Sequence, residues 1–153
     1  MIELERTREW EAIKAVVTHP KVYLHVSDDF SPSAEAWEPI KDDTAWYVLV
    51  RDAEEVLGLW AFFPENAICW DVHTCLLPTA YGERARQAVN QVPDWIWQHT
   101  QCVRIVTKVP AYNRIALKFA KVAGMTEYGC NPRSYMKDGK LHDLILLGMS
   151  KGA

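Results

Sequence analysis

Two side chains that can move protons lie two residues apart in an apolar segment of the sequence. Asp71 and His73 belong to residues 67–77, which the alternation of residue types predicts as a strand. Residues two apart on a strand share one face, so Asp71 can orient His73 or act as the base itself. The ordinary pKa of histidine, about 6.5, suits a general base at neutral pH. The alternative is a buried, hydrogen-bonded histidine in a tryptophan-rich core, and the sequence leaves both interpretations open.

A polar residue, Asn113, lies where a predicted strand meets a predicted helix. The β-branched residues of 103–109 favour a strand, which Pro110 ends. Apolar residues then recur at helical spacing up to Gly124, which suits the left-handed position after a last helical turn. The helix begins at Tyr112 or Asn113, where unpaired N–H groups and the helix dipole can receive an anionic or polar ligand. Asparagine is also a common N-cap, which needs no ligand.

The remaining elements follow from periodicity and turn signals. A strand is expected at residues 2–5, a helix from about Thr7 that Pro20 stops, a second short helix at 21–29 and a weakly helical segment at 34–40. Strands at 44–51, 55–63 and 67–77 form an antiparallel meander. Residues 83–100 form a helix, in which Pro93 either makes a kink or begins a second helix. Strands at 128–137 and 141–150 form a hairpin around Asp138-Gly139.

Both this order of elements and one motif resemble the GNAT superfamily of N-acetyltransferases. The motif consists of an Asn after the fifth strand, an Ala three positions later and a Gly-Met pair further along, here Asn113, Ala116, Gly124 and Met125. The last third is similar to the ribosomal-protein N-acetyltransferase branch and, more loosely, to acetyltransferase-like proteins of tailed bacteriophages. The resemblance implies an α/β fold with a mixed, mostly antiparallel sheet, a splayed parallel pair at strands 4 and 5, helices on both faces and a C-terminal hairpin.

The resemblance further implies that acetyl-CoA lies between strands 4 and 5, with its pyrophosphate on the loop after strand 4. Small residues there let backbone N–H groups approach the phosphates. Tyr81 stands where the family usually has Arg or Gln, and Arg84 replaces the second Gly of the pattern, so the segment also reads as a simple strand-to-helix turn. The positions expected to bind the cofactor are Leu76, Leu77, Gly82, Glu83, Arg84, Ala85, Arg86, Asn113 and Ala116.

Acetyl transfer to an amine needs a base for the amine and a proton donor for the departing thiolate. His73 is the candidate base, with Asp71 as its partner or substitute. Many family members carry a Tyr seven residues after the Asn, but this chain has Ala120 there. Tyr112 is a candidate donor in its place, although an aromatic residue at a helix start also packs as a hydrophobic staple.

Composition narrows the class of protein. The 153 residues, 49% hydrophobic, suit one domain spanning 1–153, and the net charge of −3 argues against nucleic acid as a partner. The four cysteines have no metal-like spacing and read as reduced core thiols, so no metal site is expected. The sequence lacks a signal core and a membrane-spanning run, which predicts a cytoplasmic protein.

Seven tryptophans are unusual for so short a chain. Trp46, Trp60 and Trp70 are expected in the core. Trp95 and Trp97 cannot share one helix face, so one of them is expected at an exposed partner surface.

The sequence therefore predicts an acetyl-CoA-dependent N-acetyltransferase whose acceptor is a primary amine, on a protein N-terminus or a small molecule. The alternative is a GNAT-fold module without catalysis that acts in bacteriophage head assembly or host interaction. A homodimer or a phage assembly partner is compatible with either.

Overall fold

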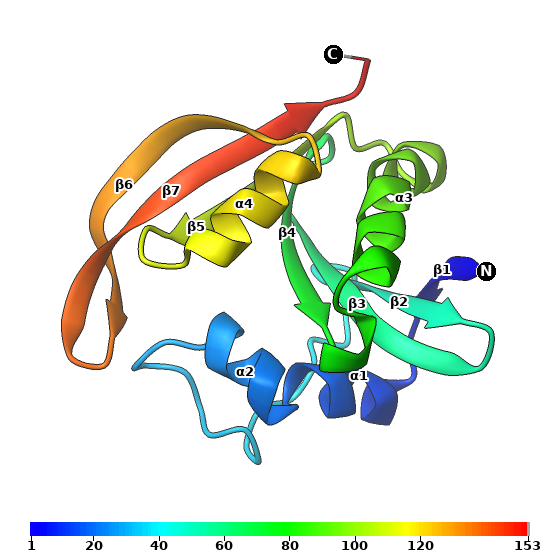
Figure 1. The fold of residues 1–153 in the computed structure, drawn as a ribbon, viewed down its shortest axis with the longest axis horizontal. Coiled ribbons are helices and arrows are strands. Elements are labelled where there is room, and N and C mark those ends of the chain that lie inside the picture. Colours follow the sequence, from blue (N-terminus) through cyan, green and yellow to red (C-terminus); the bar gives the residue numbers. More distant parts are fainter. Residues whose placement is uncertain (153) are drawn as a thin grey trace.

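One seven-stranded sheet in the order β1-β2-β3-β4-β5-β7-β6 organises the chain (Figure 1). This computed structural model describes residues 1–152. The strands are β1 (Ile2–Thr7), β2 (Trp46–Asp52), β3 (Glu55–Pro64), β4 (Cys69–Leu76), β5 (Arg104–Pro110), β6 (Thr126–Lys137) and β7 (Lys140–Ser150). The helices are α1 (Trp10–Val17), α2 (Pro20–Val26), α3 (Glu83–His99) and α4 (Arg114–Val122), with a short 3-10 turn at Pro78–Ala80.

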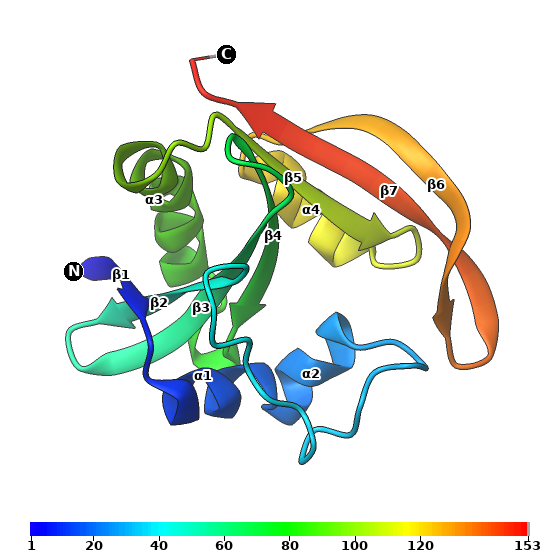
Figure 2. The same ribbon diagram turned by 180° about the vertical axis from the view of Figure 1, so that it is seen from behind.

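The two faces of the sheet are covered by different helices. Alternate residues of β2, β3 and β4, such as Val48, Phe62 and Val72, pack with the apolar side of α3. Their neighbours, such as Leu49, Ala61 and Cys75, pack with α1 and α2. Figures 1 and 2 show α3 and α4 together on one side of the sheet. The period of two along the central strands therefore decides which side chains meet each helical layer.

β4 and β5 are parallel neighbours only at their beginnings. Their register runs from Cys69–Arg104 to Asp71–Val106, and no further rung joins them in the described chain. The Thr107 hydroxyl donates to the carbonyl of Val72 at 3.0 Å, just past the last rung. Beyond this point the two strands diverge, as seen in Figure 2. The predicted fold class, with its splayed parallel pair, helices on both faces and C-terminal hairpin, is confirmed.

Most predicted elements are present, and the Asp138-Gly139 turn is confirmed, with φ of 53° and 75°. The first helix begins at Trp10 instead of Thr7, and Pro20 begins α2, where its missing N–H costs nothing. The prediction of helix at 34–40 is wrong. Those residues form a turn, in which the Ser33 carbonyl accepts from Ala36 and Trp37, followed by extended chain. α3 is a single helix that contains Pro93.

Two side-chain predictions also need correction. Cys75 and Cys102 are buried thiols, but Cys69 is only half-buried and Cys130 is exposed on β6, so the cysteines are not all core residues. Trp95 and Trp97 both lie half-buried against the α3 side of the core, which argues against one of them being a free partner surface. Trp60 and Trp70 are buried as predicted, whereas Trp46 is half-buried.

Gly58 lets the end of β4 approach β3 closely, which fixes the strand that precedes the α3 loop. A Cβ at Gly58 would lie 2.3 Å from the carbonyl oxygen of Cys75. Gly58→Ala is therefore expected to lower the free energy of unfolding by about 2 kcal/mol or more, because strand backbone must move. Gly139→Ala is the matched control, since Gly139 also has positive φ but open space around its Cα. Denaturant unfolding that gives equal losses for both variants would contradict the steric argument.

Candidate active site

Asp71 lies at the last rung of the β4–β5 ladder, where the strands separate. Asp71 and Cys75 are four residues apart on β4 and therefore point to the same face of the sheet, the one that α1 and α2 cover. The residue is only 9% exposed, and its Oδ1 is buried without a hydrogen-bond partner in the structure. A buried carboxylate oxygen without a donor is costly.

His73 extends from the same face two residues further along β4. Its Nε2 is 3.6 Å from the Oδ2 of Asp71, and its ring packs edge-on against Phe63 at 5.3 Å between centroids. The side chain is 43% exposed, so the interpretation of His73 as a buried core histidine is wrong. The structure brings together the predicted pair of carboxylate and imidazole. Its role in proton transfer remains a prediction.

Lys108 on β5 completes this cluster, and sequence reasoning missed it. Its Nζ is 3.9 Å from Asp71 Oδ2, and its side chain is 46% exposed. Side chains alternate between the two faces of β5. Ile105 and Val109 point to one face and belong to buried clusters, so Lys108 points to the other face. In the parallel pairing of β4 and β5 this is also the face of Asp71, so the sequence could have predicted that Lys108 faces Asp71 across the gap.

The N-terminus of α3 has a backbone suited to anion binding. Gly82 precedes the helix with φ of 98°, and no side chain caps the helix. The first N–H groups of any α-helix lack intrahelical partners and attract negative charge. A positive φ here favours glycine, whose lack of Cβ also leaves the approach to these groups open.

Arg84, which replaces a family glycine, points away from this N-terminus. Its guanidinium donates to both Glu55 carboxylate oxygens at 2.8 and 3.2 Å and to the Thr79 carbonyl at 2.6 Å. These hydrogen bonds lower the pKa of Glu55. The side chain is held between Glu55 at the β2–β3 turn and Thr79 in the 3-10 turn before α3, and its charge is paired, so it offers no free cation to a phosphate. The backbone N–H of Arg84 remains available in the first turn.

The other residues predicted to bind the cofactor are partly buried in the core and partly exposed to solvent. Leu76 and Ala85 are buried in the core, so only their backbone can meet a ligand, and Leu77 is half-buried. Glu83 and Arg86 are exposed and form an ion pair at 3.3 Å on the first turn of α3. Among these residues, only the side chains of Glu83 and Arg86 can therefore contact a ligand.

Asn113 caps α4. Its Oδ1 accepts from the backbone N–H of Ala116 at 3.1 Å, which joins the two residues that the family motif pairs. The cap interpretation is confirmed. A further contact with a ligand stays a prediction.

Tyr112 contacts the C-terminal hairpin instead of the Asp71–His73 pair. Its ring packs against His142 with centroids 4.5 Å apart. Partial burial raises the pKa of its hydroxyl, which therefore keeps its proton at neutral pH. Tyr135 on β6 lies beside it and donates to the Ser27 carbonyl at 2.9 Å, and burial raises its pKa to about 12.

The tip of the β6–β7 hairpin is tied to the segment after α2. Both Asp29 carboxylate oxygens accept backbone N–H groups, from Asp138 and Gly139, at 2.8 Å. The Lys137 ammonium donates to the carbonyls of Leu24 and Ser27. We call this set of contacts the α2–hairpin bridge. It joins two segments, more than a hundred residues apart in the sequence, on the side of the molecule where β5 ends.

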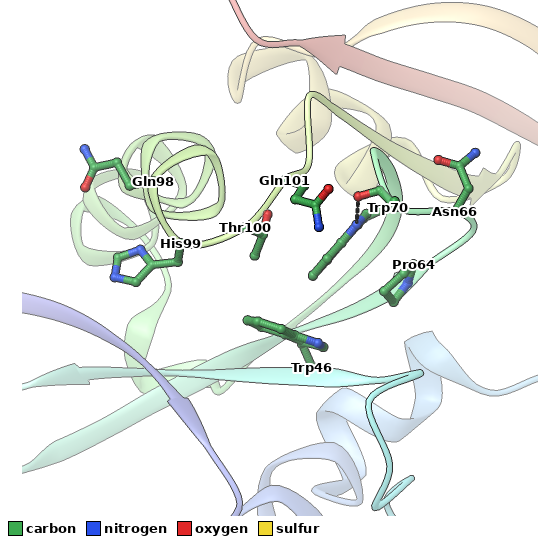
Figure 3. Close-up of a pocket in the computed structure, with 9 residues that line it drawn as sticks. Trp46, Pro64, Asn66, Trp70, Gln98, His99, Thr100 and Gln101 are labelled. Carbon is green, nitrogen blue, oxygen red and sulfur yellow. Dashed lines mark hydrogen bonds between the residues drawn. The ribbon is translucent and has the colours of Figure 1, made fainter.

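Two hollows of about 520 Å³ each lie away from the Asp71 cluster. One is at the start of β4 on the α3 face of the sheet, lined by the two indoles Trp46 and Trp70 and by polar residues at the end of α3 (Figure 3). The other follows α4 and is lined by Arg114, Leu117, Lys118, Lys121 and Val122. None of the predicted site residues lines either hollow.

Over residues 1–152, no cluster of three or more His, Cys, Asp or Glu side chains is arranged to hold a metal ion. None of the helices in that range has the length and apolar character needed to cross a membrane.

The arrangement of sheet, splayed pair and helices is that of the GNAT acetyltransferase fold. The structure of spermidine N-acetyltransferase from Vibrio cholerae with CoA and spermine superposes with a TM-score of 0.82 at 16% identity, covering 98% of this chain and 95% of that one. A chimera of the Vibrio cholerae enzyme SpeG and hSSAT gives a TM-score of 0.80 at 17% identity, covering 97% and 95%. No family model and no curated relative matches the sequence. These likenesses establish the fold.

The Asn113 cap can be tested by stability alone. Asn113→Ala is expected to lower the free energy of unfolding by about 1 kcal/mol, because the Ala116 N–H loses its acceptor. Asn113→Asp should keep the wild-type value, since aspartate caps equally well. Chemical denaturation of the three proteins measures this, and equal stability of the wild type and Asn113→Ala would show that the cap contributes nothing.

Proposed function

We propose that the protein is an N-acetyltransferase that uses acetyl-CoA to acetylate a small amine. The observation that carries the proposal is the succession of three features along β4 and the loop that follows it. These are the gap between β4 and β5, the uncapped N-terminus of α3 and the Asp71–His73 pair. The fold supports it, because a neighbour at TM-score 0.82 holds CoA and spermine.

The donor would lie with its pyrophosphate at the first turn of α3. Gly82 leaves the approach open, and the N–H groups of Glu83, Arg84 and Ala85 can donate to phosphate oxygens. The hollow along α4 is lined by Arg114, Lys118 and Lys121, whose positive charge suits the anionic end of CoA. Exposed backbone groups in the diverging strands would receive the amide groups of the pantetheine arm.

In the reaction, the neutral amine nitrogen attacks the thioester carbonyl. A C–N bond forms, the C–S bond breaks, and the amine proton passes to a base while the thiolate takes a proton. His73 is accessible and paired with Asp71, so it can accept the amine proton, and Asp71 can hold its ring in place. Tyr112 carries an intact O–H at neutral pH and is the candidate donor for the thiolate.

A small amine is favoured over a protein N-terminus by the α2–hairpin bridge. Tyr135, Lys137 and Asp29 join the hairpin to α2 on the acceptor side of the sheet. A folded substrate would have to pass this bridge, whereas a small molecule need not. The alternative is a module without catalysis that acts in phage assembly or host interaction. It is favoured if acetyl-CoA does not bind.

Acetyl-CoA is expected to raise the melting temperature of the purified protein, because a ligand that binds only the native state stabilises it by mass action. At a concentration 100 times Kd the gain is about 2.7 kcal/mol. Thermal unfolding with and without millimolar acetyl-CoA measures this shift. An unchanged melting curve would reject the proposed function.

Gly82→Trp should abolish that shift by filling the approach to α3. The variant will itself melt lower, because Gly82 has a positive φ, so the ligand-induced shift is the quantity to compare. Gly152→Trp is the matched control, with φ of 75° and open surroundings at the far end of β7. It should keep the full shift.

His73→Ala is expected to lower turnover about 100-fold or more while leaving the acetyl-CoA shift unchanged, because it removes a proton-transfer step. His73→Gln serves as a control for side-chain volume and should be equally impaired. If turnover per folded molecule stays at the wild-type level, His73 is not the base and Asp71 takes that role.

A further inference from the structure

We propose that the acceptor of this enzyme is an amino-acid-type zwitterion, with one ammonium group and one carboxylate on the same carbon, held by Asp71 and Lys108. This inference rests on the proposed acetyltransferase function and specifies its substrate class. It differs from what the fold neighbours suggest, since one of them binds the polycation spermine.

The first observation is the carboxylate of Asp71. Its side chain is 13% exposed, with Oδ1 buried and Oδ2 facing His73 Nε2 at 3.6 Å and Lys108 Nζ at 3.9 Å. Its neighbours His73 and Lys108 are 43% and 46% exposed, so the cluster is reachable from outside. Asp71 Oδ2, on the side of His73 and Lys108, has no hydrogen-bond donor within 3.5 Å among the described residues, so it can accept from the ammonium group of a ligand.

The second observation is that several acidic side chains near the C-terminal hairpin already have structural hydrogen bonds. Asp29 accepts two backbone N–H groups with its two oxygens, and Asp28 accepts from Phe30 in a local turn. Asp143 accepts the backbone N–H of Arg133. These carboxylates keep their charge, but their oxygens bind backbone N–H groups that fix loops. Within the cluster of Asp71, His73 and Lys108, Asp71 is the one carboxylate, so the cluster matches one ammonium.

The third observation is the cation beside Asp71. Lys108 Nζ is 3.9 Å from Asp71 Oδ2, a loose contact that leaves most of its hydrogen-bonding capacity open. A second ammonium on the acceptor would be repelled by Lys108, whereas a carboxylate would be attracted. Because the ammonium and carboxylate of an amino acid are separated by a single carbon, the pair can meet Asp71 and Lys108 together.

The site thus presents one negative and one positive group side by side, which is the complement of a zwitterion. Phe63, packed on His73, supplies an apolar wall next to the reacting nitrogen. In this arrangement Lys108 is a residue that determines specificity, and Asp71 orients both the acceptor nitrogen and His73.

The experiment measures kcat/KM with acetyl-CoA for the twenty amino acids, their carboxamides and spermidine, by following release of the CoA thiol. Each amide lacks the negative charge of its amino acid and also has a less basic amine, so kcat/KM is expressed per concentration of neutral amine. For the best amino acid, the wild type should prefer the acid over the amide about tenfold, the value of one charge-assisted contact at a partly exposed site. Spermidine should be poorer still.

Variants of Lys108 separate charge from packing. Lys108→Met keeps the length of the side chain and should remove the preference for acid over amide. Lys108→Glu should reverse it and improve spermidine. Circular dichroism and melting temperature verify that each variant folds, and the acetyl-CoA shift should be unchanged in both, because Lys108 lies on the face opposite α3.

The outcomes are distinguishable. If acetyl-CoA does not bind, the proposed function fails before the acceptor matters. If acetyl-CoA binds but amides or spermidine are used as well as amino acids, or no amino acid is acetylated, the zwitterion proposal is overturned. An acid preference that survives Lys108→Met overturns the role of Lys108.

Discussion

The separation of β4 and β5 after three parallel rungs is the feature on which the candidate site depends. A parallel pair that ends early leaves backbone groups of both strands without partners, and such groups are costly unless they are hydrated or bind something else. Here the side chain of Thr107 satisfies the first of them, the carbonyl of Val72. The same divergence leaves the Asp71 carboxylate at the head of a gap, with His73 and Lys108 beyond it on the two separating strands.

The surrounding elements keep this gap in place. Gly58 brings β3 against the end of β4, α3 begins a few residues later without a side-chain cap, and the Asn113 cap starts α4 after β5. Arg84 departs from the family pattern, but its side chain does not occupy the N-terminus of α3. The glycine position of the pattern is filled by a large cation, yet its side chain is bound by Glu55 at the β2–β3 turn and by the Thr79 carbonyl. The backbone of the α3 N-terminus is thereby left as open as a smaller residue would leave it.

Much of the fold could be predicted from sequence because its signals are local. Period-two alternation marked β2, β3 and β5, and Asp138-Gly139 marked the hairpin turn. The segment 34–40 failed because helix propensity there has no apolar face to pack, and the turn held by Ser33 prevailed. Cys130 was misjudged because β6 is an edge strand whose first nine residues are exposed, and this depends on sheet order, which no local pattern reveals.

Within the site, the Asp71–His73 pair could be predicted from one strand, whereas Lys108 required the pairing of two strands. The diversion of Arg84 required knowing where Glu55 lies.

The central claim, that the gap between β4 and β5 and the α3 N-terminus together form the acetyl-CoA site, is tested most directly by hydrogen exchange with and without CoA. Leu77 donates its N–H to Leu57 on β3, so by alternation the amides of Thr74 and Leu76 face the gap, and those of 83–85 lie in the first turn of α3. The account predicts that CoA slows the exchange of these amides, with little change in α1. Protection confined to the Trp46–Trp70 hollow, or no protection at either segment, would contradict it.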